Sequence, residues 1–197
     1  MIAEQNALKE LEQKQVAKVL VISDSHGYKE NLRHALELYA HSSDALLFLG
    51  DGIQDLFNII EENSHIPSDI SIIPPVVAFV RGNGDDSVYS LATQEVQRIE
   101  IPETQIVTVA GKKIFMSHGH RLDVYYTRDF IISKVQQAEC SVGLFGHTHV
   151  PFQERIGDIL ILNPGSCSRP RNYSDKSCVI LTIKKDSAQV EYEFYSL

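Results

Sequence analysis

Short apolar runs alternate with helical stripes in the first eighty residues of the chain. The runs at 18–23, 45–49 and 76–80 are rich in β-branched or other apolar residues and predict buried strands. Between them, residues 29–40 carry apolar side chains at helical spacing, and residues 53–62 have a helical pattern. The first part of the chain therefore predicts a βαβα order.

The remainder of the chain has a β-rich pattern interrupted by one helix around 128–138. The predicted strands lie near 97–101, 105–110, 112–117, 141–145, 151–156, 158–162, 177–184 and 188–196. Two stretches of different pattern favour an α/β fold, in which a mixed sheet packs against a second sheet and helices cover the outside.

The first 16 residues are polar and contain Leu8 and Leu11, a pattern that favours a short helix. They have no apolar region of the signal-peptide type, and no segment approaches the ~20 apolar residues that cross a bilayer. We therefore expect a cytoplasmic protein without membrane contact. The absence of a linker favours a single domain over 1–197, with 1–16 as an N-terminal extension that could form an oligomer contact.

The net charge of −8 comes from 26 acidic and 18 basic residues and makes a nucleic-acid partner unlikely. A small phosphorylated substrate stays open, because bound divalent cations would make its site positive. Cys140, Cys167 and Cys178 are odd in number and lack zinc-site spacing, so we expect free thiols.

Five predicted strands end in residues of the types that bind divalent metals. The segments that follow are Asp24-Ser25-His26, Asp51, Asn83-Gly84-Asp85, His118-Gly119-His120 and His147-Thr148-His149. Ligands bind beyond the carboxyl ends of strands in α/β sheets, so we expect these segments to meet at one edge. In extended backbone, residues i and i+2 face the same side, which predicts that Asp24 with His26, and His147 with His149, converge on one site.

The candidate ligands offer oxygen and nitrogen donors and no thiolate. They are Asp24, His26, Asp51, Asn83, His118, His147 and His149. Seven ligands are too many for one ion and suit two divalent metal ions that share a carboxylate. The donor types favour Mn first, with Ni, Co, Fe or Zn as alternatives. A plain surface or core role is the alternative for any single histidine, and we assign it to His34, His41 and His65.

These segments resemble the motifs of the calcineurin-like metallophosphoesterases, in the same order. The matching blocks are SDSHG at 23–27, GDGIQD at 50–55, RGNGD at 81–85, SHGH at 117–120 and GHTH at 146–149. The resemblance covers roughly 17–184 and is closest to the small YfcE-like phosphodiesterases. The segment NPGSCSRPR at 163–171 also resembles the closing motif of that group. It implies a four-layer α/β/β/α sandwich.

The resemblance also implies a role for each ligand. Asp24, His26 and His149 would hold the first metal, Asn83, His118 and His147 the second, and Asp51 would bridge both. The implied activity is hydrolysis of a small phosphate ester, first of all a phosphodiester, by a hydroxide that bridges the two metal ions. The catalytic candidates are Asp51, Asn83 and His120.

One position departs from many phosphatases of the superfamily, which carry a leaving-group acid, a His, directly after the motif Asn. Gly84 stands there, as is common in the YfcE-like group. His120 is the candidate proton donor, and its alternative role is support of His118 or the loop. Asp85 is expected to orient the Asn83 loop.

Three arginines lie nearest the motifs: Arg81, Arg169 and Arg171. Each has either a surface role or a phosphate contact, for which the guanidinium geometry is suited. Cys167 is expected to be a packed side chain, since no Ser or Cys lies in a nucleophile motif.

Two rival functions share this fold. One is a protein-interaction scaffold such as the eukaryotic retromer subunit, in which the metal positions are partly altered, whereas every position is filled here. The other is a nuclease, which usually adds capping or DNA-binding segments that this acidic chain lacks. A homodimer or higher homo-oligomer is expected from the family.

Overall fold

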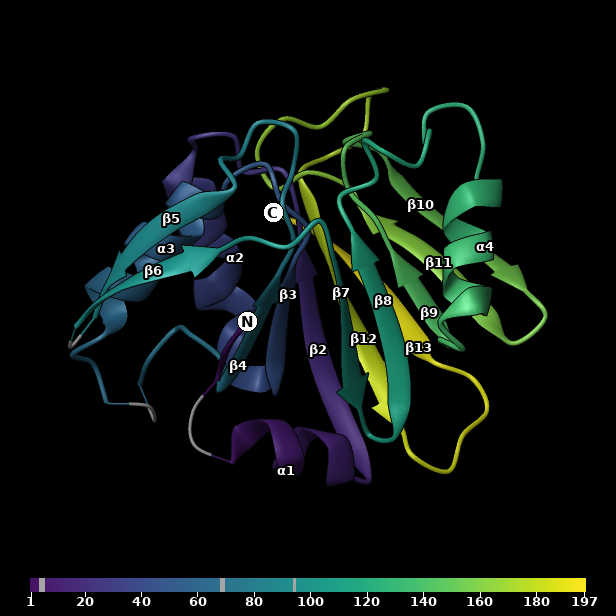
Figure 1. Cartoon of the computed structure of the whole chain (residues 1–197), viewed down its shortest axis with the longest axis horizontal. Helices are drawn as coiled ribbons and strands as arrows, with labels where there is room; N and C mark the ends of the chain where they lie inside the picture. Colours follow the sequence, from purple (N-terminus) through teal and green to yellow (C-terminus); the bar gives the residue numbers. More distant parts are fainter. Residues whose placement is uncertain (4–5, 68–69, 94) are drawn as a thin grey trace.

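The structure is a computed structural model that describes residues 1–3, 6–67, 70–93 and 95–197. Its strands form a six-stranded sheet, a five-stranded sheet and a two-stranded hairpin (Figure 1). The two large sheets face each other, and helices lie on their outer sides (Figure 1). No described helix is long and apolar enough to cross a membrane.

The six-stranded sheet has the order β1-β4-β3-β2-β12-β13. Its strands are β1 (Ile2–Ala3), β2 (Val16–Ile22), β3 (Ala45–Phe48), β4 (Val76–Phe79), β12 (Ser177–Lys184) and β13 (Glu191–Ser196). The central strands β2, β3 and β4 are parallel, as the predicted βαβα order requires. The helices of this part are α1 (Ala7–Gln13), α2 (Lys29–Tyr39), α3 (Ile53–Asn63) and the short 3₁₀ helix η1 (Ala40–Ser42).

The five-stranded sheet has the order β10-β11-β9-β8-β7. Its strands are β7 (Thr104–Val109), β8 (Lys112–Ser117), β9 (Val142–Leu144), β10 (Pro151–Ile156) and β11 (Ile159–Pro164), and its helix is α4 (Asp129–Gln137). The hairpin is formed by β5 (Val88–Ala92) and β6 (Val96–Glu100). β8 and β9 are parallel, so their carboxyl ends lie at the same edge.

Three apolar clusters separate the layers. Successive residues of a strand face opposite sides, so Val19 and Val21 of β2 lie in the cluster between the two sheets, whereas Leu20 and Ile22 pack with α2 and α3. A third cluster joins the second sheet to α4, with Ile131 as a fully buried member. Strands buried on both faces are apolar throughout, which is why β3 and the segment Val19–Ile22 of β2 form continuous apolar runs in the sequence. The predicted four-layer α/β/β/α sandwich is confirmed.

The first 16 residues are part of this packing. The predicted helix is α1, and its Leu11 is buried, while the Leu11 carbonyl accepts a hydrogen bond from the Ala110 amide at 2.9 Å. Ile2 pairs with Val77 at the edge of the first sheet, and residues 4–5 lie outside the described range. The segment is therefore integrated into the first sheet and contacts β7 rather than extending from the fold.

Candidate metal centre

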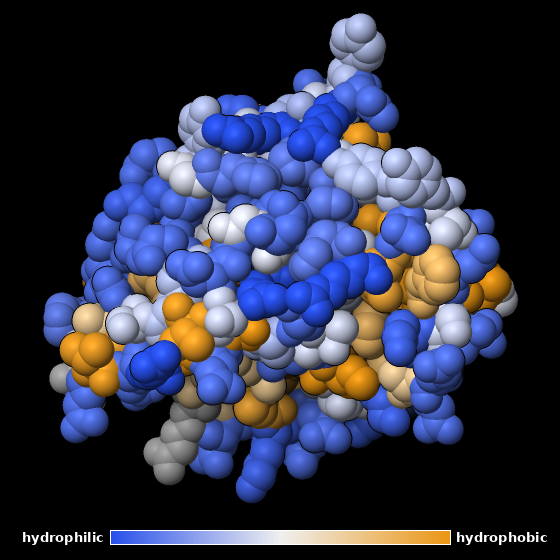
Figure 2. Space-filling model, turned by 45° about the horizontal axis from the view of Figure 1, so that its top comes forward, coloured by the Kyte–Doolittle hydropathy of each residue, from blue (hydrophilic) through white to orange (hydrophobic). Residues whose placement is uncertain are grey.

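The five polar segments lie at one edge of the molecule, at the carboxyl ends of β2, β3, β4, β8 and β9. Main-chain hydrogen bonds join them: the Asp24 amide donates to the Gly50 carbonyl at 3.0 Å, and the Gly146 amide donates to the His118 carbonyl at 3.0 Å. The expectation that these segments meet is confirmed. Figure 2 looks onto this side of the molecule, where most of the surface is hydrophilic.

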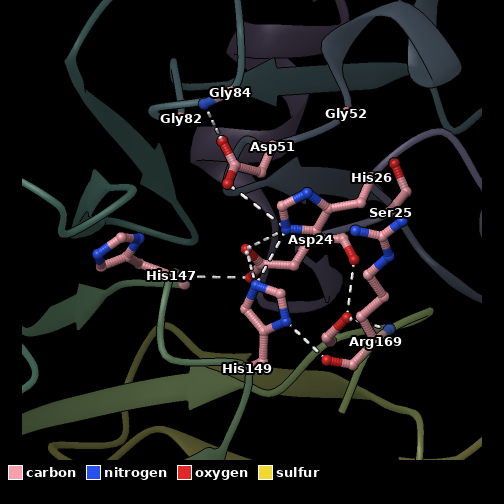
Figure 3. A network of polar contacts seen from close by, with 12 residues as sticks. Asp24, Ser25, His26, Asp51, Gly52, Gly82, Gly84, His147, His149 and Arg169 are labelled. Atoms are coloured by element: carbon pink, nitrogen blue, oxygen red, sulfur yellow. Dashed lines mark hydrogen bonds and ion pairs between the residues drawn. The ribbon is translucent and has the colours of Figure 1, made fainter. Parts of the chain in front are cut away.

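Two groups of metal-ligating side chains form at this edge. The first contains Asp24, His26 and His149, and the second contains Asp51, His118 and His147. Within each group the ligand atoms lie within 4.8 Å of one another. In the first group, the Nε2 atoms of His26 and His149 are 3.0 Å apart (Figure 3). These are two candidate metal sites, and they bring together six of the seven predicted ligands.

Asp51 belongs to the second group and also faces His26 of the first (Figure 3). Its Oδ2 atom is 3.5 Å from Nε2 of His26 and 3.4 Å from Nε2 of His118. Its other oxygen, Oδ1, accepts a hydrogen bond from the Gly84 amide at 2.7 Å. One carboxylate oxygen is therefore held in place, while the other faces both groups. Asn83 is exposed on the turn after β4, directly before Gly84, and is the one predicted ligand outside the two groups.

The backbone of the ligand segments is not extended. Asp24, His26, Asp51, His147 and His149 all have positive φ, between 48° and 66°. Left-handed backbone is uncommon for residues other than glycine, although Asp and His adopt it more readily than most, and its cost of about 1–3 kcal/mol each is a strain that concentrates at functional sites. His147 and His149 lie in the two adjacent groups, so they converge on one site as expected, but His149 belongs with Asp24 and His147 with Asp51.

Both buried histidines are oriented by main-chain carbonyls. Nδ1 of His118 donates to the Leu49 carbonyl and Nδ1 of His149 to the Arg169 carbonyl, each at 2.6 Å. In a neutral ring, this assigns the proton to Nδ1 and leaves a lone pair on Nε2. Such a carbonyl partner is typical of metal-ligating histidines. The tautomers are thus set so that both Nε2 atoms present acceptors to the site.

Acceptor atoms consequently face one another across the site. Nε2 of His149 is 3.3 Å from Oδ1 of Asp24, and Nε2 of His118 is 3.4 Å from Oδ2 of Asp51. Oδ1 of Asp24 and Nε2 of His118 are both buried, and neither has a hydrogen-bond partner among the described residues. Buried acceptors with no donor are costly, and a cation between them removes that cost. The residues present therefore fit divalent metal ions.

The protonation states also suit metal ligands. Burial alone would raise the pKa of Asp24, but the neighbouring imidazoles of His149 and His26 hold it well below its usual range. Burial and the charge of His118 lower the pKa of His147 to about 4, so its ring is neutral near neutral pH. Burial opposes a rise in the pKa of His118, but the neighbouring carboxylates of Asp51 and Asp24 outweigh it. Positive charge is therefore favoured at His118 beside the two carboxylates, and a bound metal ion would supply it in place of the proton.

Asp85 connects two of the ligand loops. Its carboxylate accepts hydrogen bonds from the amides of Asp51, Gly52, Ile53 and Gly82, at 2.7 to 3.0 Å. The expected orienting role is confirmed, and it extends to the Asp51 loop and the start of α3. One carboxylate thereby fixes the relative position of the loops that carry Asp51 and Asn83.

The closing segment 163–171 supports the Asp24 loop. The hydroxyls of Ser166 and Ser168 both donate to the Asp24 carbonyl, at 2.7 and 2.8 Å. Cys167 between them is fully buried, and burial raises the pKa of its thiol far above the usual range. The expectation that Cys167 is a packed side chain is confirmed. The sequence had indicated this motif without predicting its role as a brace.

His120 lies beside the second group. Its ring centroid is 5.5 Å from that of His118 and 6.1 Å from that of His147. Its Nε2 atom is 3.7 Å from Oε2 of Glu103, which also pairs with Arg81. Burial and the charge of His118 lower the pKa of His120. Glu103 lies outside the five motif segments, so the sequence did not indicate it as a residue of the site.

The remaining candidate residues have defined places. The Arg169 guanidinium lies over the Tyr28 ring, 5.0 Å from its centroid. The Arg171 amide donates to the His149 carbonyl at 3.1 Å, and its side chain binds the hydroxyl of Tyr125. His34, His41 and His65 are exposed, away from the two groups, in line with the surface role assigned to them.

Gly82 has room for no side chain. A Cβ there would lie 2.1 Å from Oδ1 and 2.4 Å from the amide nitrogen of Asp51. We expect Gly82→Ala to displace Asp51 and to lower kcat by about 10²-fold, because a 1 Å misplacement can have an effect of that size. Steady-state kinetics would measure it. Gly157→Ala is the control, since a Cβ at Gly157 meets nothing within 4 Å. Equal activity in the two variants would contradict this packing argument.

The calcineurin-like phosphoesterase superfamily domain matches residues 17–186. The chain belongs to this family. Membership makes it a phosphoric ester hydrolase that depends on divalent metal.

Two curated relatives span most of the chain. The probable metallophosphoesterase YsnB of Bacillus subtilis is 27% identical over 174 residues, which cover 88% of this chain and 89% of YsnB. Phosphodiesterase YfcE of Escherichia coli K12 is 28% identical over 168 residues, which cover 78% of this chain and 81% of YfcE.

Solved structures of the same fold match as well. A predicted phosphoesterase from Streptococcus pneumoniae has a TM-score of 0.65 at 25% identity, covering 93% of this chain and 99% of that one. Vacuolar protein sorting 29 from Cryptosporidium parvum has a TM-score of 0.68 at 17% identity, covering 93% and 100%. The second likeness concerns the fold alone.

Proposed function

We propose that this phosphoesterase is a phosphodiesterase that uses two divalent metal ions. Asp24, His26 and His149 would hold one ion, Asn83, His118 and His147 would hold the other, and Asp51 would be shared. The observation that carries this proposal is the set of acceptor atoms that face one another without a donor, with Oδ2 of Asp51 3.5 and 3.4 Å from a histidine of each group. Mn is the proposed metal, with Ni, Co, Fe or Zn as alternatives.

The side chains of the site divide the work. Bound metal ions act as Lewis acids that activate water and neutralise charge on the phosphate. Asp24 and Asp51 supply negative charge, since their pKa values are lowered against the effect of burial. Asn83 would supply an amide oxygen from its exposed turn. The carbonyls of Leu49 and Arg169 hold two of the imidazole rings in the ligating orientation.

Attack on phosphorus would come from water directly, without a covalent protein intermediate. Ser25 lies between two candidate ligands, but its hydroxyl is buried and donates to Asp55 at 2.6 Å. Cys167 is buried with a raised thiol pKa. Neither has the exposed, activated form of a nucleophile.

His120 beside the second group is the candidate proton donor for the leaving group, but burial lowers its pKa, so its ring is a poor source of a proton near neutral pH. The departure at Gly84 makes a test possible. A Cβ at Gly84 would lie 3.2 Å from Oδ1 of Asp51, so a side chain fits after a shift of the neighbouring atoms. We expect the wild-type protein to favour esters with good leaving groups.

Gly84→His should add an acid and raise the rate for esters with poor leaving groups by about tenfold or more, since general acids contribute 10²–10⁴-fold. The dependence of kcat/KM on leaving-group pKa, measured with a series of aryl esters, should become shallower. Gly84→Asn is the control, because it adds a side chain without a suitable proton. An unchanged slope in Gly84→His would contradict the assignment of the missing acid.

The function is tested by metal removal and return. The chelator-treated protein would be assayed with a bis-aryl phosphodiester and an aryl phosphomonoester while Mn, Ni, Co, Zn and Mg are added separately. We expect diester hydrolysis to return with a transition metal and to exceed monoester hydrolysis. Recovery of monoester hydrolysis alone would leave a phosphoesterase but contradict the diesterase proposal.

The scaffold and nuclease alternatives are less favoured. The ligand positions that define the family motifs are filled by ligating residues, and the net charge of −8 opposes a nucleic-acid backbone. A small phosphate ester is the proposed substrate, and a homodimer or higher homo-oligomer and a cytoplasmic location stay predictions.

A further inference from the structure

A cavity of about 190 Å³ lies directly beside the candidate metal centre. Its wall includes Thr148, which stands between the ligands His147 and His149, and Arg171, whose amide binds the His149 carbonyl. Tyr125 forms another part of the wall, and its hydroxyl donates to the His147 carbonyl at 3.0 Å. The cavity is therefore built from the same main chain that positions the two histidines, one in each metal group.

The lining combines an apolar surface with hydrogen-bond donors. Val124, Val150, Pro151 and Phe152 supply the apolar part. Arg128 supplies a guanidinium that lies over the Phe152 ring, 4.5 Å from its centroid. Its Nη1 donates to the carbonyls of Val124 and Thr127, and its buried Nε has no hydrogen-bond partner among the described residues. A flat ring can be held between apolar side chains and a guanidinium plane.

The charged groups of the lining are all positive. Arg128 and Arg171 are the charged side chains among the described residues that line the cavity, and no described carboxylate does so, although the chain as a whole has a net charge of −8. Guanidinium groups donate and never accept hydrogen bonds. The cavity therefore suits a ring that carries acceptor atoms, and it disfavours a purely hydrocarbon group or a cation.

Exposed aromatic side chains surround the same face. Of the eight tyrosines, the four that are exposed among the described residues all follow a ligand or the closing segment. They are Tyr28, Tyr125, Tyr126 and Tyr173. Exposed tyrosines beside arginines form stacking surfaces for the bases of nucleotides. All four tyrosines therefore lie on loops that follow a candidate ligand or the closing segment.

We propose that this cavity is the subsite for a nucleobase, so that the substrate is a phosphodiester that contains a nucleoside. The proposal rests on the proposed phosphodiesterase function for the position of the phosphate. The base would enter the space between the apolar wall and the two arginines, while the phosphate occupies the metal centre. Val150 and Arg171 would determine specificity, because they face the ring and do not belong to either metal group.

The test compares two ligands that differ only by the base. Binding of adenosine 5′-monophosphate and of ribose 5-phosphate to the Mn-loaded protein would be measured by calorimetry. We expect the first to bind at least tenfold more tightly. Val150→Phe, which fills the cavity, and Arg171→Ala, which removes a donor, should each reduce this ratio to near one. Arg98→Ala on the exposed surface of β6 is the control and should leave the ratio unchanged.

Two outcomes separate this subsite from the catalytic proposal. Equal affinities for the two ligands in the wild-type protein, with hydrolysis of a bis-aryl phosphodiester intact, would overturn the subsite and leave the phosphodiesterase standing. A preference for the base-containing ligand that disappears in Val150→Phe, without hydrolysis under any metal, would support the subsite and contradict the catalytic proposal. If both Val150→Phe and Arg171→Ala still bound adenosine 5′-monophosphate more tightly than ribose 5-phosphate, the base would not occupy this cavity and the proposal would be overturned.

Discussion

Asp51→Asn should lower diester hydrolysis by about 10²-fold or more and reduce the metal content of the protein. Oδ2 of Asp51 faces a histidine of each group, at 3.5 and 3.4 Å, so one substitution weakens both proposed ion sites. Mutation of a residue that only hydrogen-bonds a metal ligand lowers metal affinity by about 10–100-fold. Mutation of a ligand that two ions share should lower it further. Asparagine keeps the shape and an acceptor for the Gly84 amide, so the change removes mainly charge.

Kinetics with saturating Mn and metal analysis after desalting would measure these two effects. Asp158→Asn, on an exposed turn between β10 and β11, is the matched control and should behave as the wild type. Circular dichroism would establish that the Asp51→Asn protein is folded. Wild-type activity of Asp51→Asn in metal-limited buffer would show that Asp51 is not shared between two ions.

Asp85→Ala should lower the free energy of unfolding by about 3 kcal/mol and remove most of the activity. Four amides lose their common acceptor, and hydrogen bonds to charged groups each contribute about 1.5–3 kcal/mol. The expected loss of stability is smaller than the sum for four hydrogen bonds, because water can reach some of the freed amides of this partly buried site. The loops that carry Asp51 and Asn83 would then be free to separate.

Urea unfolding and steady-state kinetics would measure this variant. Asp86→Ala is the natural control, because Asp86 is the exposed neighbour and its carboxylate accepts none of these four hydrogen bonds. We expect Asp86→Ala to retain both stability and rate. Equal unfolding curves for the two variants would contradict the role assigned to Asp85.

The fold was predictable where burial is complete. β3, β4 and the part of β2 from Val19 to Ile22 are covered on both faces, so their sequences are apolar without interruption. β5 (Val88–Ala92) was missed, because it pairs with β6 alone and has a single buried residue, Leu91. β1 has two residues, too few for any periodicity to be visible.

The site was predictable in its residue types and its location, because ligands follow the carboxyl ends of strands. Its division was not derivable from spacing, since Asp24 and His26 share a group whereas His147 and His149 do not, although both pairs have the same spacing and positive φ. The resemblance to a family supplied the division that the geometry later matched. The carbonyls of Leu49 and Arg169 that orient His118 and His149 could not be predicted, because every residue has a carbonyl and only the fold selects these two.

A crystal structure of the protein soaked in Mn, with diffraction recorded at the Mn absorption edge, tests most directly whether two ions bind at one edge and share Asp51. We expect two anomalous peaks, one among Asp24, His26 and His149 and one among Asn83, His118 and His147, both in contact with Asp51. A single peak, or peaks that leave Asp51 without a contact, would contradict this expectation.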